Sequence, residues 1–130
     1  MPHWSERYIG RPYSSTNDCA QLAFDVRCEV FGSIPEHLLS LERERTSLTR
    51  ARQMDTLVHD LGTPTTTPEE GDAVLMLVRG RASHIGIYCS PNGVPSVLHA
   101  MKNAKQAVLH RLVDLPRLLL AVEGYYKWPT

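Results

Sequence analysis

Three side chains of this sequence are of the types that nucleophilic catalysis by a cysteine requires: Cys19, His84 and His99. A thiol can attack a carbonyl carbon when a neighbouring imidazole takes its proton, and a further polar group keeps that imidazole in one orientation. Cys19 falls in the first turn of an expected helix, where free backbone N–H groups and the helix dipole favour an anion. We therefore expect a lowered pKa for this thiol, and a thiolate at neutral pH. The alternative is that all three are ordinary packing residues.

The helix that must carry Cys19 is expected to begin after Asn17 or Asp18, both of which are good N-caps. Its apolar residues recur at helical spacing, and Gly32 is expected to end it. They are Leu22, Ala23, Val26, Val30 and Phe31. Residues 4–10 predict a short amphipathic helical piece, and residues 36–61 predict a second, more polar helix or a broken pair. The charged run 42–45 is interpreted as a solvated face.

The two histidines fall in segments that predict strands. Residues 73–78 form a continuous apolar run typical of a strand buried on both faces. Residues 83–89 alternate, so that His84, Gly86 and Tyr88 share one face and Cys89 lies on the other. Residues 96–101 predict the next strand, and antiparallel pairing would bring His99 beside His84.

Two more strands are expected at residues 107–113 and 118–128, whereas residues 62–70 are expected to form a loop. Helices come first and strands second, which predicts an α+β fold for one domain over residues 1–130. Its helical part covers about residues 4–61 and its strand part about residues 71–128.

Composition narrows the classes of function. Lys+Arg and Asp+Glu both number 14 in a chain of 130 residues, so no basic excess favours nucleic acid as a partner. No apolar run approaches the roughly 18–20 residues that span a bilayer. The first residues lack the apolar core of a signal peptide, so we expect synthesis in the cytoplasm and export, if any, by another route.

The remaining cysteines and histidines are expected to be structural. Three cysteines with no CxxC pair favour reduced thiols over a disulfide framework, and Cys28 and Cys89 are interpreted as packing residues. A zinc site from Cys19, His84 and His99 is chemically allowed. It is the weaker hypothesis, because a cysteine at a helix tip with a histidine base needs no metal, and we expect no cofactor. The other histidines are expected to be exposed or capping: His3, His37, His59 and His110.

Five short sequence motifs occur in a characteristic order: residues 8–13 (YIGRPY), 17–19 (NDC), 71–74 (GDAV), 83–88 (SHIGIY) and 98–100 (LHA). In this order the chain resembles the NlpC-like cell-wall cysteine peptidases, a papain-like group of bacterial and phage enzymes. It is most similar to the short form in tail-tip assembly proteins of long-tailed phages, with Trp4 before the first motif and Gly124-Tyr125-Tyr126 near the end. The resemblance extends from Trp4 to Trp128.

This resemblance implies a papain-like fold, with N-terminal helices packed on a central antiparallel sheet of about five or six strands. It also implies roles for the catalytic residues. Cys19 would be the nucleophile, and His84 the base toward the thiol and the acid toward the leaving amine. His99 would orient the His84 ring. The Tyr13 hydroxyl would join the Cys19 backbone N–H in stabilising the oxyanion.

The resemblance further implies that the substrate is a peptidoglycan stem peptide. Asp18 would meet its free amine, although a plain N-cap role competes, and Ala20 and Ser83 would line the substrate. The family commonly has Ser-Gly or Trp-Gly after the cysteine, where this chain has Ala20-Gln21. That departure leaves substrate preference open.

The implied function is a cysteine hydrolase of amide bonds in peptidoglycan, acting as a phage or prophage tail-tip component. Its implied location is the virion tail, or the periplasm and cell wall after delivery without a signal peptide. Two alternatives remain: a structural module with little activity that binds other tail-tip proteins, and an interbacterial amidase toxin.

Overall fold

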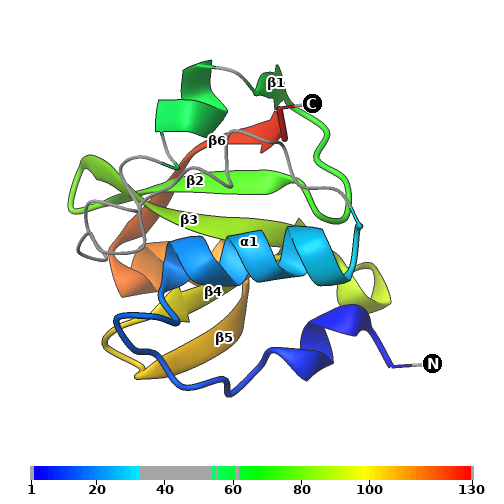
Figure 1. The fold of residues 1–130 in the computed structure, drawn as a ribbon. Helices are drawn as coiled ribbons and strands as arrows, with labels where there is room; N and C mark the ends of the chain where they lie inside the picture. Colours follow the sequence, from blue (N-terminus) through cyan, green and yellow to red (C-terminus); the bar gives the residue numbers. More distant parts are fainter. Residues whose placement is uncertain (1, 33–53, 55, 61, 130) are drawn as a thin grey trace.

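The computed structural model describes residues 2–32, 54, 56–60 and 62–129, with only the backbone for residues 81–83 (Figure 1). Its named elements confirm the order of helix first and strands second. They are η1 (Trp4–Arg7), α1 (Cys19–Glu29), β1 (Thr63–Thr65), β2 (Ala73–Val78), β3 (Arg81–Cys89), η2 (Pro91–Gly93), β4 (Ser96–Met101), β5 (Gln106–Arg111), η3 (Leu112–Leu118) and β6 (Leu120–Lys127).

All six strands belong to one antiparallel sheet, in the order β1-β6-β2-β3-β4-β5. The chain is therefore α+β with a six-stranded antiparallel sheet, as expected. The prediction of a loop over residues 62–70 was wrong in part, because Thr63–Thr65 pairs with β6 at the sheet edge. This strand is only three residues long and contains a proline, so its own sequence gives little indication of pairing.

Helix α1 lies across β3 and β4 (Figure 1). Asp18 is its N-cap, and the Asp18 carboxylate accepts the backbone N–H of Gln21 at 2.8 Å. Leu22, Ala23 and Val26 are buried on the face toward the sheet, which confirms the predicted apolar face. Residues 54 and 56–60 are also helical, and the rest of the expected helix 36–61, with its charged run 42–45, lies outside the described residues.

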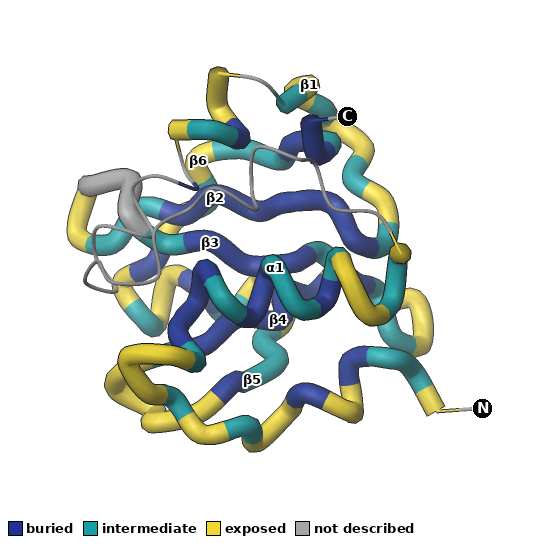
Figure 2. Tube along the Cα trace, viewed as in Figure 1, coloured by how far each residue is buried: buried dark blue, intermediate teal, exposed yellow. Residues whose placement is uncertain are grey.

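The sheet is buried on both faces along β2, as its continuous apolar sequence predicts (Figure 2). Leu75 faces the core on the α1 side. Val74 and Met76 face a second core, in which Leu115 from η3 and Leu120 from β6 are buried. Thus η3 packs on the face of the sheet opposite to α1.

Strand β3 is irregular where it carries His84. Met76 pairs with His84 and Leu77 with Ala82, so Ser83 is an extra residue opposite β2. Such a bulge bends a strand and increases its twist. Beyond it, pairing between β3 and β4 is short and covers Ile87 with Leu98, Tyr88 with Val97, and Cys89 with Ser96. Backbone pairing between the two strands therefore ends before His84 is reached.

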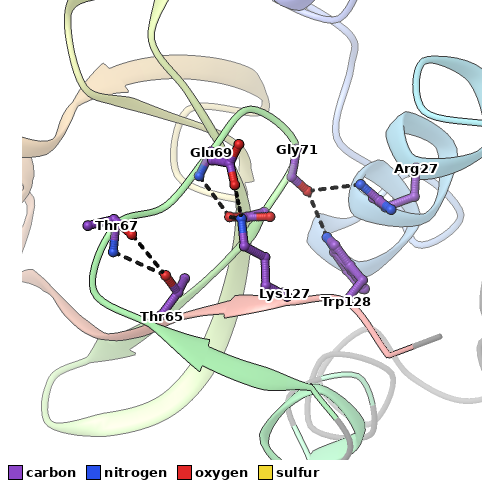
Figure 3. Close-up of polar contacts among 8 residues, drawn as sticks. Arg27, Thr65, Thr67, Glu69, Gly71, Lys127 and Trp128 are labelled. Atoms are coloured by element: carbon purple, nitrogen blue, oxygen red, sulfur yellow. Dashed lines mark hydrogen bonds and ion pairs between the residues drawn. The ribbon is translucent and has the colours of Figure 1, made fainter.

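The end of β6 is fastened to the turn that precedes β2 (Figure 3). The Trp128 indole N–H donates to the Gly71 carbonyl at 2.8 Å, and Arg27 of α1 reaches the same oxygen at 3.5 Å. The Lys127 ammonium lies 2.8 Å from Glu69 and 2.6 Å from Asp72. These contacts join α1, the turn and the last strand into one unit.

Gly86 lies between His84 and Tyr88 on β3, at a position that has no room for a side chain. A Cβ there would lie 2.5 Å from Val97 Cγ2 and 3.0 Å from the Leu98 carbonyl oxygen. We expect Gly86→Ala to lower the free energy of unfolding by about 1–3 kcal/mol, because the neighbouring strand must shift. Urea denaturation measures this change.

The control for this prediction is the same substitution in a Val97→Ala background, where the closest clashing methyl is gone. The cost of Gly86→Ala should be smaller there, giving a clear coupling energy between the two sites. Equal stability of wild type and Gly86→Ala would contradict the tight packing described here.

Candidate active site

Cys19 is the first residue of α1, and its side chain is buried, with 7% of the residue exposed. Burial raises the pKa of the thiol to about 11, although the backbone N–H groups of Ile85, Ala20 and Cys19 itself lower it. The expectation of a lowered pKa was therefore wrong. The loss of solvent raises the thiol pKa by more than the helix N-terminus lowers it, because the N–H groups stabilise the thiolate less than water would.

His84 and His99 come together as the strand pattern predicts. Nε2 of His84 lies 2.8 Å from Nδ1 of His99, and the ring centroids are 5.0 Å apart at an interplanar angle of 69°. His99 has no exposed surface. The bond holds the His84 ring by one nitrogen and leaves its Nδ1 available to another group.

A third histidine extends this pair. Nδ1 of His110 lies 2.9 Å from Nε2 of His99. His110 is only half-buried, and it lies on β5 opposite Val97 of β4. The expectation that His110 is an exposed or capping residue was wrong. The indication in the sequence was the hairpin between β4 and β5, whose register places residue 110 on the His99 face.

All three rings are neutral at pH 7. Burial lowers the pKa of His84 to about 4 and lowers the pKa of His99 well below its usual range, and the neighbouring rings lower that of His99 further. Burial also lowers the pKa of His110, against the opposing effect of the Asp114 carboxylate. The resting site thus holds a thiol and neutral imidazoles.

The Cys19 thiol contacts β3 at the residue that follows His84. The thiol lies at the backbone N–H of Ile85, and His84, the preceding residue, pairs with Met76 next to the bulge of β3. Among the described residues, no hydrogen bond joins the Cys19 thiol to a histidine ring.

The other predicted site residues lie around the start of α1. Tyr13 is half-buried in the preceding loop, and its backbone N–H bonds the Lys105 carbonyl at 2.9 Å. Asp18 is fully buried as the N-cap, so the structure shows that alternative, and its role toward a substrate amine stays a prediction. Ala20 is buried in the α1 core. Ser83 lies in the bulge of β3, and its side chain is not described.

The remaining cysteines differ from each other. Cys89 is buried as expected, but Cys28 is exposed, so the packing role expected for it was wrong. Its position on the solvent side of α1 explains this.

Two of the remaining histidines are described. His3 caps η1 and lies 2.9 Å from Glu70, as a capping histidine should, and His59 is exposed. His37 lies outside the described residues. Within the described part of the chain, no group of three or more histidine, cysteine or acidic side chains is arranged to hold a metal ion.

Comparison with known proteins gives no match: no family model, no curated protein and no solved structure is similar to this chain. No helix among the described residues is long and apolar enough to cross a membrane.

The buried histidines predict acid sensitivity of the fold. The folded pKa of His84 is about 4 and the unfolded value is 6.5, so the unfolded chain binds the proton first as pH falls. Stability is complete above about pH 6.5 and is lost below it, and we expect His84 alone to cost about 2 kcal/mol at pH 5.

Urea unfolding between about pH 8 and pH 4.5 tests this prediction, with the slope of stability against pH as the readout. His84→Gln should flatten the slope, whereas His59→Gln, at a side chain that is 57% exposed, should leave it unchanged. An unaltered slope in His84→Gln would show that the ring is solvated in the folded protein.

Proposed function

We propose that this protein is a cysteine hydrolase of the papain-like NlpC type that cleaves amide bonds in peptidoglycan stem peptides. The observation that supports it is the placement of Cys19 at the tip of α1 against Ile85, next in the chain to a histidine whose ring is held by a second one. The substrate class, peptidoglycan stem peptides, is proposed from the sequence motifs that resemble the NlpC-like family. We further propose that it acts in a phage or prophage tail tip, and reaches the cell wall by that delivery.

The proposed reaction begins with both groups neutral. As Sγ of Cys19 bonds to the scissile carbonyl carbon, its proton passes to Nδ1 of His84, the nitrogen that His99 leaves available. His84 then gives this proton to the leaving amine as the C–N bond breaks, which leaves an acyl-enzyme. Water attacks the acyl carbon, its proton passes through His84 to the thiolate, and Cys19 is restored.

The developing oxyanion needs fixed donors. The backbone N–H groups of Cys19 and Ala20 lie at the thiol, at the N-terminus of α1, where free donors gather. In the proposal the Cys19 N–H and the Tyr13 hydroxyl stabilise the oxyanion, while Asp18 caps the helix that holds this donor in place.

A second candidate function is a structural module of the tail tip with little activity. The observation that favours it is the buried thiol, whose pKa of about 11 and lack of a hydrogen bond to a histidine, among the described residues, describe an inert cysteine. Such a module would keep the fold for contacts with other tail-tip proteins.

The hydrolase proposal predicts that Cys19→Ala and His84→Ala each reduce muropeptide cleavage to background. Mass spectrometry of digested peptidoglycan measures the products, and circular dichroism checks that each variant is folded. The matched control is Cys28→Ala, which removes an exposed thiol on the same helix and should cleave like wild type. Identical product patterns from wild type and Cys19→Ala would rule the proposal out.

Alkylation kinetics separate the two candidates without knowledge of the substrate. If His84 accepts the Cys19 proton, the Cys19 rate should fall at least about tenfold in His84→Ala, while exposed Cys28 serves as an internal reference. Peptide mass spectrometry across pH gives the rate at each cysteine. A Cys19 that reacts more slowly than Cys28, and equally in both proteins, favours the structural module.

A further inference from the structure

Three histidine rings form a continuous hydrogen-bonded chain across three neighbouring strands, from His84 on β3 through His99 on β4 to His110 on β5. We propose that His110 is a positioning residue: through His99 it determines which ring nitrogen of His84 carries the proton. This inference rests on the proposed function for its catalytic meaning, but the coupling of the rings can be tested without any substrate.

The argument starts from His99, whose two ring nitrogens are both used. Nδ1 bonds His84 and Nε2 bonds His110, and the residue has no exposed surface. A neutral imidazole has one donor and one acceptor nitrogen. His99 must therefore donate to one neighbour and accept from the other, so the direction of one bond fixes the direction of the second.

Only one direction leaves His84 able to act as a base toward Cys19. When Nε2–H of His84 donates to His99, and Nε2–H of His99 donates to His110, Nδ1 of His84 keeps a free lone pair. This arrangement has every ring in the Nε2–H form, which is the more stable tautomer of a free histidine side chain. The site is then ready to take the thiol proton.

Protonation of His110 reverses the direction of both hydrogen bonds between the three rings. An imidazolium donates from both nitrogens, so Nδ1–H of His110 must donate to Nε2 of His99. His99 then carries its proton on Nδ1 and donates to Nε2 of His84. Consequently, His84 carries its proton on Nδ1, where it can no longer receive one from Cys19.

The His110 ring lies next to an open cavity. Asp114, Arg117 and Leu118 line a cavity of about 300 Å³ together with His110, on the face away from α1. Asp114 favours the imidazolium, but its carboxylate is bonded to Arg111 at 2.9 Å and to Arg117 at 2.6 Å. From β4, the neutral ring of His99 faces His110. Protonation of His110 from the cavity thus controls His84, the base at the other end of the three hydrogen-bonded rings.

The variant His110→Asp separates positioning from packing, because a carboxylate only accepts hydrogen bonds at the place of Nδ1. It should hold His99 and His84 in the Nε2–H form at every pH above the titration of His84 itself. His110→Asn is the matched control of the same size, since its amide can donate or accept and carries no charge.

The decisive measurement is long-range ¹H–¹⁵N NMR of the histidine rings in the full chain, from about pH 8 to pH 4.5. In wild type, the His84 proton should move from Nε2 to Nδ1 as His110 titrates, and in His110→Asp this change should be absent. A His84 tautomer that stays constant while His110 titrates in wild type would overturn the proposal.

Muropeptide cleavage supplies the second readout. The acid limb of the wild-type rate should follow the His110 titration, and it should shift to lower pH in His110→Asp, toward the pKa of about 4 of His84. A tautomer change in a protein that cleaves nothing would uphold the coupling and refute the hydrolase. Cleavage with an acid limb that is the same in wild type and His110→Asp would refute the coupling alone.

Discussion

The arrangement of this protein depends on His99, a polar ring that is completely buried in the sheet. Such a group is tolerated only if both of its nitrogens find partners, because an unpaired polar atom in a dry core costs several times what a hydrogen bond contributes. The two partners come from the strands on either side, His84 and His110. The register of β4 with β5 places His99 and His110 on one face of the sheet, and this allows their rings to meet.

Cys19 illustrates the opposite balance. Its position at the start of α1 supplies the N–H groups that stabilise a thiolate, yet burial against Ile85 raises the pKa by more than these donors lower it. Burial likewise keeps His84 neutral. Both groups are therefore uncharged at neutral pH, and the fold does not have to bury an ion pair between them.

The sequence predicted those parts of the fold that depend on local patterns. The apolar run at residues 73–78, the strand at residues 96–101, the Asp18 cap and the alternation around His84 each depend on a few neighbouring residues, and these predictions were confirmed. The pairing of β6 with β2 and the short β1 depend on contacts between distant segments, whereas the role of His110 depends on the exact register of the hairpin between β4 and β5. The direction of the Cys19 pKa shift was also missed, because residue spacing shows a helix end but not how much water is removed from it. The papain-like family assignment remains a prediction.

The order of the sheet has a consequence for how the chain folds as it is synthesised. Strands β2 to β5 follow one another and pair with sequence neighbours, so these four strands can form early as successive hairpins. Strand β6 is made later, yet it lies between β1 and β2 in the sheet. Until β6 emerges from the ribosome, the free edge of β2 and the whole of β1 are without their partner. The growing chain therefore exposes an apolar strand edge for a time, when association with other chains competes with folding.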